Sequence, residues 1–232
     1  MLFKFLFLIL QISYVVDQEV QNLPGLSKIA FKHYSGYLNA SSTHFLHYWF
    51  VESQSNPSND PLLLWMNGGP GCSSLDGFLS ELGPFLVNDD GDTLRMNPFA
   101  WNKKANVIFL EAPAGVGFSY SSNGDVTTND DQTSMENYRA LQHFFETFPR
   151  FKINDFYVTG ESYGGIYVPT LAVRILEGMK EYPGIAVGNG MLDFALNTNT
   201  LIEFAYNHGL VDEKPECQKA DEVNRDYQPI VD

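Results

Sequence analysis

The chain is poor in basic residues, in cysteine and in long apolar runs. Its 14 Lys and Arg are outnumbered by 28 Asp and Glu, which gives a formal net charge of −14 and argues against the basic surface that nucleic-acid binding needs. Only two cysteines, Cys72 and Cys217, occur; an even count invites a disulfide, but their spacing alone does not assign one. Because 44% of the residues are apolar and 14% aromatic, the composition excludes a disordered chain.

The one long apolar run lies at the N-terminus. Residues 1–10 (MLFKFLFLIL) carry a single lysine, and polar residues follow at 17–19. The run is too short to span a bilayer and predicts a signal peptide over residues 1–16; a buried first helix or an uncleaved anchor is the alternative. We therefore expect a protein of the secretory pathway, lysosomal or secreted, with no membrane attachment once the signal is removed. On that route Asn39, followed by Ala40 and Ser41, is a candidate N-glycosylation site.

The rest of the chain alternates strand and helix patterns. Residues 29–37 and 44–52 are rich in aromatic and β-branched side chains and predict short antiparallel strands. Apolar runs followed by glycine are typical of strands buried on both faces of a parallel sheet, and they occur at residues 61–66, 105–110, 155–159 and 184–187. Helices are predicted from about residue 130 to residue 148 and from about 163 to 180.

This order predicts an α/β fold, with a mostly parallel central sheet and helices on both faces, over residues 17–190. From residue 191 the pattern weakens. Residues 191–232 are predicted to begin a second, cap-like subdomain, with a frayed C-terminus as the alternative.

The sequence Gly160-Glu161-Ser162-Tyr163-Gly164 directly follows a predicted buried strand and opens a predicted helix. A Gly-x-Ser-x-Gly turn in that position predicts a nucleophile elbow, in which the serine hydroxyl projects from the sheet. Glycines are expected on both sides because a Cβ there would strike the neighbouring strand and helix. The N–H of Tyr163 would face a developing oxyanion. A tight turn that happens to contain serine is the alternative.

A second glycine-rich turn, residues 67–71 (NGGPG), ends an earlier buried strand. In an α/β-hydrolase this position supplies the other oxyanion donor, because paired glycines let the backbone approach the substrate. A plain Gly/Pro turn is the alternative. It explains the glycines, but it does not explain why they lie at the end of a strand, in the position that the predicted nucleophile elbow requires.

Five segments together resemble the serine carboxypeptidase family, at fitting spacings between about residues 26 and 210: residues 65–74 (WMNGGPGCSS), 80–85 (SELGPF), 97–102 (NPFAWN), 111–120 (EAPAGVGFSY) and 160–169 (GESYGGIYVP). The resemblance implies an α/β-hydrolase fold. It also implies release of C-terminal residues from peptides and proteins through an acyl-enzyme on Ser162. Neither a cofactor nor a metal is expected.

The resemblance implies roles for the residues around Ser162. The N–H groups of Gly69 and Tyr163 would hold the oxyanion. Asn67, the backbone of Gly68 and the side chain of Glu161 would bind the free carboxylate of the substrate. Trp65 would support that pocket, and Glu81 would pair with Glu161. In the family the two glutamates pair, and a shared proton raises one pKa. Without the resemblance, Glu81 is more simply a surface glutamate at a turn.

A complete catalytic triad is not predicted. His208 is the only histidine after Ser162, and Asp193 is the only aspartate between them. Both lie in the predicted start of the cap, so neither is expected to act on Ser162. In the family the Asp and His come from later strands, so the sequence looks like the N-terminal half of such a protein, and its own activity is doubtful.

Three further expectations depend on this resemblance. The first alternative to a peptidase is a catalytically inactive binding or protective protein on the same scaffold, and the second is a related acyltransferase.

The resemblance also places the disulfide partner of Cys72 in the later half of the family's sequences, so Cys72 and Cys217 are expected to stay unpaired.

Overall fold

The computed structural model describes residues 18–26, 28–178 and 184–210. The predicted signal peptide, Cys217 and most of the predicted cap lie outside these residues. Ten strands are described: β1 (Gln18–Glu19), β2 (His33–Asn39), β3 (His44–Val51), β4 (Leu62–Met66), β5 (Phe85–Val87), β6 (Leu94–Met96), β7 (Asn106–Leu110), β8 (Tyr120–Ser121), β9 (Phe156–Glu161) and β10 (Gly184–Gly188). The helices are η1 (Gly77–Glu81), η2 (Trp101–Lys103), α1 (Asp130–Thr147), η3 (Pro149–Ile153), α2 (Gly164–Gly178) and α3 (Phe194–Asn207).

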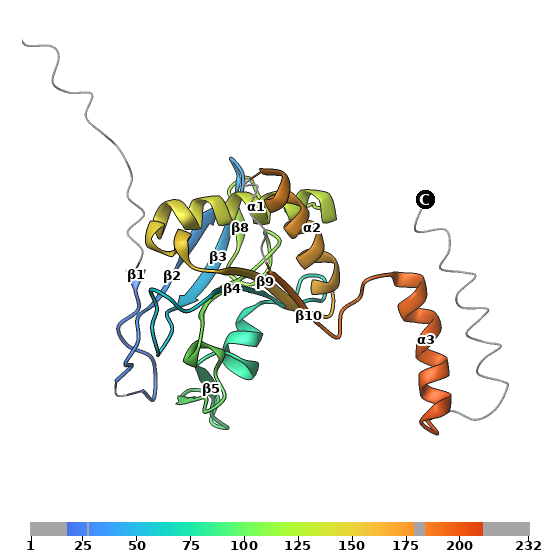
Figure 1. Ribbon diagram of the computed structural model, residues 1–232, viewed down its shortest axis with the longest axis horizontal. Coiled ribbons are helices and arrows are strands. Elements are labelled where there is room, and N and C mark those ends of the chain that lie inside the picture. The colour runs from blue at the N-terminus through green and yellow to red at the C-terminus, as the bar shows by residue number, and fades with distance from the viewer. Residues whose placement is uncertain (1–17, 27, 179–183, 211–232) are drawn as a thin grey trace, which may run out of the picture.

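The main sheet has the order β1-β2-β3-β7-β4-β9-β10, with β8 pairing on β3. The four strands β7, β4, β9 and β10 run parallel, and β1, β2 and β3 extend the sheet in antiparallel fashion. All five residues of β7 are buried, as expected of a strand covered on both faces. The predicted α/β architecture with a mostly parallel central sheet is therefore confirmed (Figure 1).

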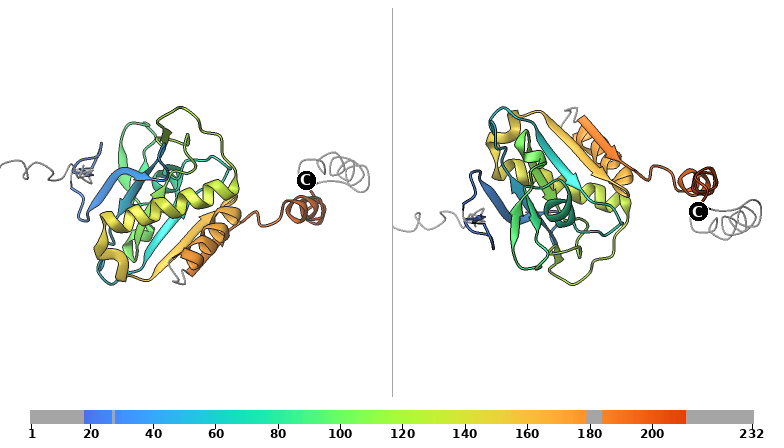
Figure 2. Two further views of the ribbon diagram at one scale, coloured as in Figure 1. Left: turned by 90° about the horizontal axis from the view of Figure 1, so that it is seen from above. Right: turned by 90° about the horizontal axis from the view of Figure 1, so that it is seen from below.

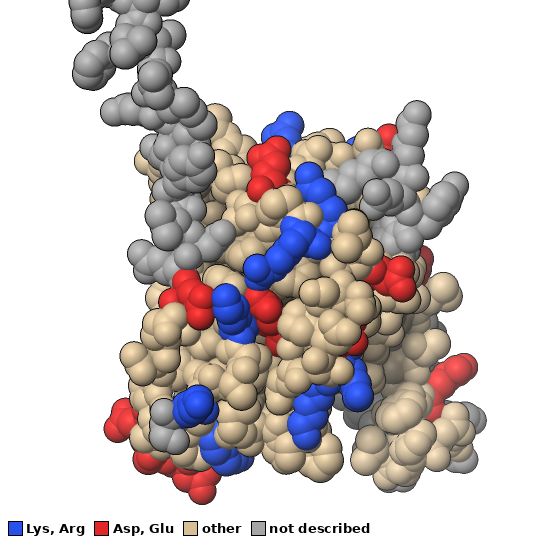
Figure 3. All heavy atoms as spheres, turned by 60° about the vertical axis from the view of Figure 1, so that its left-hand side comes forward, with Lys and Arg blue, Asp and Glu red and all other residues tan. Residues whose placement is uncertain are grey.

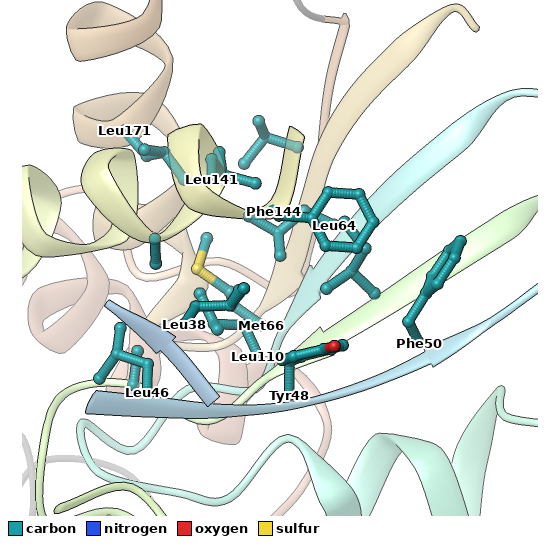
Figure 4. Packing of buried hydrophobic residues seen from close by; sticks show 14 of the residues in the cluster. Leu38, Leu46, Tyr48, Phe50, Leu64, Met66, Leu110, Leu141, Phe144 and Leu171 are labelled. Atoms are coloured by element: carbon teal, nitrogen blue, oxygen red, sulfur yellow. The ribbon is translucent and has the colours of Figure 1, made fainter. Parts of the chain in front are cut away.

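The two long helices, α1 and α2, lie side by side on one face of the sheet (Figure 2, left). The side chain of Asn129 caps α1 by accepting the N–H of Gln132 at 2.9 Å, and the acidic Asp130 and Asp131 follow in the first turn, where they favour the helix dipole. Apolar residues of both helices and of the strands interlock beneath them (Figure 4). This core supports the elbow from below.

The opposite face is covered differently. It carries the one-turn π-helical segment η1 and the hairpin of β5 and β6, in place of a long helix (Figure 1). A second apolar cluster, which includes Phe78 and Phe85, fills this side. Helices thus lie on both faces as predicted, but unequally. The elements β5, β6 and η1 were not predicted from the sequence, because segments of three to five residues are too short to show a periodic pattern.

Helix α3 stands apart from the sheet at the end of an extended segment (Figure 1). Its apolar residues are largely exposed; Leu196 and Leu201, for example, are 66% and 63% accessible. Asp193 caps the helix by accepting the N–H of Leu196 at 2.8 Å. The boundary placed at residue 190 between core and cap remains a prediction.

The surface carries charges of both signs. On the face shown in Figure 3, Lys and Arg lie among Asp and Glu, so the net negative charge is not gathered there in one patch. Within the described residues, no helix combines the length and the apolar character needed to cross a bilayer.

A buried ion pair joins α1 to the antiparallel part of the sheet. The Nδ1 of His44 lies 2.8 Å from Oε1 of Glu136, and its Nε2 lies 2.9 Å from the carbonyl oxygen of Asp125. Both partners are acceptors, so the arrangement fits the doubly protonated ring, which donates from both nitrogens. Burial alone would lower the pKa of His44, but the hydrogen bonds to Glu136 and Asp125 outweigh it and hold the pKa above its ordinary value.

This pair predicts a pH dependence of stability. Because the pKa of His44 is raised from 6.5 on folding, its contribution is complete below that value and is lost as the pH rises through the folded pKa. We expect Glu136→Gln to lower the melting temperature at about pH 5 more than at about pH 8. Glu146→Gln, an exposed change of the same charge on α1, is the control and should show no such trend. An equal loss at both pH values for Glu136→Gln, measured by circular dichroism, would contradict the assignment.

Candidate active site

Ser162 occupies the turn between β9 and α2. Its φ is +54°, in the left-handed region that non-glycine residues rarely adopt outside strained functional turns. The N–H of Ser162 donates to the carbonyl of Gly188 at 3.1 Å, and its own carbonyl accepts from Gly165 and Met191 at 2.9 and 2.8 Å. The strained turn is therefore held from both sides, by the end of β10 and by the first turn of α2, and the Ser162 side chain remains exposed.

The glycines around Ser162 are crowded, but not in the way predicted. A Cβ on Gly160 would lie 2.6 Å from the carbonyl oxygen of Met66 on the neighbouring strand, so the expectation holds there. A Cβ on Gly164 would meet that oxygen only at 3.4 Å, an ordinary contact. The constrained position in α2 is Gly165, where a Cβ would lie 2.4 Å from the carbonyl oxygen of Met191. On the helix side of Ser162, the glycine that has no room for a side chain is thus Gly165, one position later than the expected Gly164.

The second glycine turn lies directly against the elbow. A Cβ on Gly68 would come within 2.4 Å of the backbone nitrogen of Tyr163 and 2.7 Å of Cβ of Ser162. Gly69 has φ +109°, which also favours glycine. Among the described residues, neither the N–H of Gly69 nor that of Tyr163 donates to a protein acceptor. Two free donors of adjacent turns thus flank Ser162.

Asn67, the first residue after β4, is buried and uses its whole side-chain amide. Its Oδ1 accepts from Nε1 of Trp65 at 2.8 Å and from the N–H of Gly77 at 3.1 Å. Because both partners are donors only, they fix which end of the amide is oxygen. The Nδ2 donates to Oε1 of Glu81 and to Oε1 of Glu161, each at 2.9 Å. One amide therefore gathers two carboxyl groups beside Ser162.

The environment of Glu81 favours its protonated form. Partial burial raises the pKa of Glu81, the negative charges of Glu161 and Asp76 add to the rise, and the hydrogen bond from Asn67 opposes it. Glu81 is exposed as a residue, but its carboxyl group is turned towards Asn67. A protonated carboxyl next to an ionised one forms a site that can donate a hydrogen bond to an anion.

Comparisons with known proteins agree with this geometry. A model of the serine carboxypeptidase family matches residues 24–229. The chain belongs to the serine carboxypeptidase family. It is 56% identical over 197 residues to serine carboxypeptidase ctsa-4.1 of Caenorhabditis elegans, covering 83% of this chain and 42% of the relative. It is 54% identical over 197 residues to the lysosomal protective protein of Mus musculus, covering 84% and 42%.

A solved structure of the family gives the same fold. Kex1(delta)p, a prohormone-processing carboxypeptidase from Saccharomyces cerevisiae, superposes with a TM-score of 0.78 at 29% identity, covering 90% of this chain and 50% of that one. The expected α/β-hydrolase fold is thereby confirmed. The chain spans 42% of the length of the two curated relatives.

All five histidines of the chain make hydrogen bonds to groups other than Ser162. His44 and His47 pair with buried carboxylates, His33 accepts from an indole, His143 accepts from a backbone N–H, and His208 lies 2.8 Å from a backbone carbonyl. His208 ends α3, and Asp193 caps the start of that helix. Among the hydrogen bonds of the described residues, none joins either of them to Ser162; that neither acts on Ser162 stays a prediction.

The sequence did not predict two further residues at this site, Gly77 and Glu111. Gly77 has no space for a side chain, since a Cβ there would lie 2.3 Å from Nε1 of Trp65. Glu111 is fully buried and accepts a hydrogen bond from Ser73. Both fall in or beside the segments quoted for the family resemblance, but no spacing in the sequence indicates that they meet. Cys72 is exposed and pairs with no cysteine among the described residues.

The crowding at the elbow predicts different costs for two similar substitutions. Gly160→Ala should destabilise the protein by about 1–3 kcal/mol, because a methyl group would have to displace the Met66 carbonyl. Gly164→Ala lies in a helix with ordinary clearance, so it should be neutral or slightly stabilising. Urea unfolding followed by tryptophan fluorescence measures both. Equal losses for the two variants would show that the elbow is less tightly packed than described.

Proposed function

We propose that this chain carries the nucleophile and the carboxylate-recognition site of a serine carboxypeptidase that releases C-terminal residues from peptides and proteins. The observation that carries the proposal is the pair of carboxyl groups held by Asn67 directly beside Ser162. An esterase or an endopeptidase has no need of a site for an anion at this position. An exopeptidase that recognises the free end of a chain does need one.

The proposed chemistry begins at Ser162. Its hydroxyl oxygen attacks the carbon of the last peptide carbonyl. That carbon becomes tetrahedral, and the carbonyl oxygen gains negative charge. The N–H groups of Gly69 and Tyr163 are supported as its donors because each is free among the described residues and flanks the elbow. When the C–N bond breaks, the proton lost by the Ser162 hydroxyl ends on the departing nitrogen, so the C-terminal residue leaves as the free amine and an acyl-enzyme remains. Water then adds its hydroxyl group to the acyl carbon and its other hydrogen returns to the Ser162 oxygen.

Recognition of the terminal carboxylate is assigned to Glu81 and Glu161, with Asn67 as the residue that orients them. Both hydrogens of the Asn67 amide are already donated to the two carboxyls. The proton shared by the pair is therefore the one offered to the substrate carboxylate, together with the backbone of Gly68. Trp65 holds Asn67 in this orientation.

A second candidate function is binding of peptide C-termini without turnover. It is favoured by the hydrogen bonds of the five histidines, all of which lie away from Ser162. Without a base the serine hydroxyl is a poor nucleophile, and loss of a triad member costs several orders of magnitude in rate. The carboxylate site does not depend on that base.

A secretory route and an N-glycan at Asn39 are also proposed. The apolar run of residues 1–10 supports this route, and so does the similarity to the lysosomal protective protein of Mus musculus. Asn39 is exposed at the end of β2, where a glycan would meet no steric barrier from the core. The proposed route ends either in the lysosome or outside the cell.

The carboxylate site predicts selective and pH-dependent binding. We expect N-acetyl-Phe-Leu to bind, and its C-terminal amide to bind at least about tenfold more weakly. Affinity for the acid should rise from about pH 7 to about pH 4, because Glu81 takes up a proton while the peptide carboxylate stays ionised. Glu81→Gln should bind the acid with little pH dependence, and Glu146→Gln should behave as the wild type. Calorimetry that shows equal affinity for acid and amide would contradict the proposed function.

Turnover separates the two candidate functions. If the chain acts as an enzyme, it should hydrolyse a blocked dipeptide and react at Ser162 with a fluorophosphonate probe, and Ser162→Ala should do neither. If it only binds, neither reaction exceeds that of Ser162→Ala, while selective binding of the free acid persists. Mass spectrometry of the probe adduct identifies the modified residue.

A further inference from the structure

Glu111 is a buried ionisable group that the proposed chemistry does not use. It is fully buried at the end of β7, next to β4 in the sheet. Its Oε1 accepts from the hydroxyl of Ser73, and its Oε2 lies 2.9 Å from Nδ1 of His47 and from the N–H of Phe118. The carboxylate thus joins three separate parts of the chain: β3, the turn after β4 and the loop after β7.

We propose that Glu111 is a positioning residue, which holds the turn of residues 67–77 so that Asn67 faces the two site carboxyls. The proposal rests on the function proposed above. It gives Glu111, the acidic residue that begins the 111–120 segment, a role that does not need contact with the substrate.

The contacts form a continuous path from Glu111 to Asn67. The Ser73 hydroxyl donates to Glu111 and accepts the N–H of Leu75 at 3.1 Å. The adjacent Ser74 accepts the backbone N–H of Asn67 at 3.1 Å. The same turn brings the N–H of Gly77 to the amide oxygen of Asn67. Displacement of Ser73 would therefore shift both ends of the turn that orients the amide.

The charge of Glu111 is matched to this position. Burial alone would raise its pKa, but hydrogen bonds from His47, Ser73 and Phe118 outweigh burial and lower it. Among the described residues that contact the carboxylate, His47 is the titratable group, and its Nε2 lies 2.9 Å from the Ser35 hydroxyl. Gly117 leaves room for the carboxylate, since a Cβ there would lie 1.8 Å from Oε1 of Glu111. The pKa of Glu111 is thus shifted below the ordinary carboxyl value and that of Glu81 above it, so Glu111 keeps its charge to a lower pH than Glu81.

The substitution Glu111→Gln tests this role with little change in shape. The new amide nitrogen would face the donors His47 and Phe118, or else the Ser73 hydroxyl, which already accepts from Leu75. At least one hydrogen bond is lost in either orientation. Ser73→Ala breaks the same path at its other end. Glu136→Gln is the matched control, because Glu136 also pairs with a buried histidine but lies on α1, away from the turn.

The test combines two measurements on the full chain. We expect Glu111→Gln and Ser73→Ala each to weaken binding of N-acetyl-Phe-Leu about tenfold, with no further loss in the double variant. Both should also speed hydrogen exchange at the backbone N–H groups of Asn67, Cys72 and Leu75 about tenfold or more, whereas Glu136→Gln should leave those three unchanged.

Three results would overturn the positioning role: unchanged exchange in Glu111→Gln, additive losses of binding, or an equal effect of Glu136→Gln on the turn. If the wild type binds the free acid no better than the amide, the proposed function fails instead. The exchange measurement needs no peptide and still decides whether Glu111 positions the turn.

Discussion

The carboxyl ends of β4 and β9 approach so closely that no side-chain carbon fits between them. The parallel register pairs Met66 with Gly160, and Gly68 then lies against the backbone of Ser162 and Tyr163. A serine held at positive φ is unfavourable in isolation. Here the turn is fixed by backbone hydrogen bonds on either side, and its strain is supported by the surrounding sheet. The free N–H groups, the exposed hydroxyl and the carboxyl pair all take their positions from this contact.

Two carboxyl groups near that contact have opposite tendencies. Glu81 lies beside other negative charges, and its pKa is raised, whereas Glu111 lies among hydrogen-bond donors, and its pKa is lowered. Environments that separate the pKa values of neighbouring acids commonly assign them different roles. As the pH falls, Glu81 therefore takes up a proton before Glu111 does. Asn67 lies between the two groups, since its side chain donates to Glu81 and its N–H donates to Ser74, next to the Ser73 that contacts Glu111.

The two ends of the sheet are built differently. The antiparallel end is closed by the buried pair of His44 and Glu136 and by a dense aromatic core around Phe144. At the other end, β10 is the last strand of the described sheet, and Ile185 on it is 54% accessible. Helix α3 extends beyond that edge with its apolar side chains exposed. Ser162 follows β9, next to β10, and its turn is held by hydrogen bonds to Gly188 and from Gly165 and Met191.

The parallel strands, the two long helices and the turn that carries Ser162 could be predicted from the sequence, because each depends on local chemistry: apolar runs, capping residues, and glycines where a Cβ would clash. The roles that the family resemblance assigns to residues around Ser162 stay predictions. Three features could be seen only in the tertiary structure: Gly165 and not Gly164 is the crowded glycine beside Ser162, both hydrogens of the Asn67 amide go to carboxyls, and Glu111 contacts the turn through Ser73. These depend on distances between residues far apart in the chain, such as Glu111 and Ser73, and no local pattern encodes the packing that sets them.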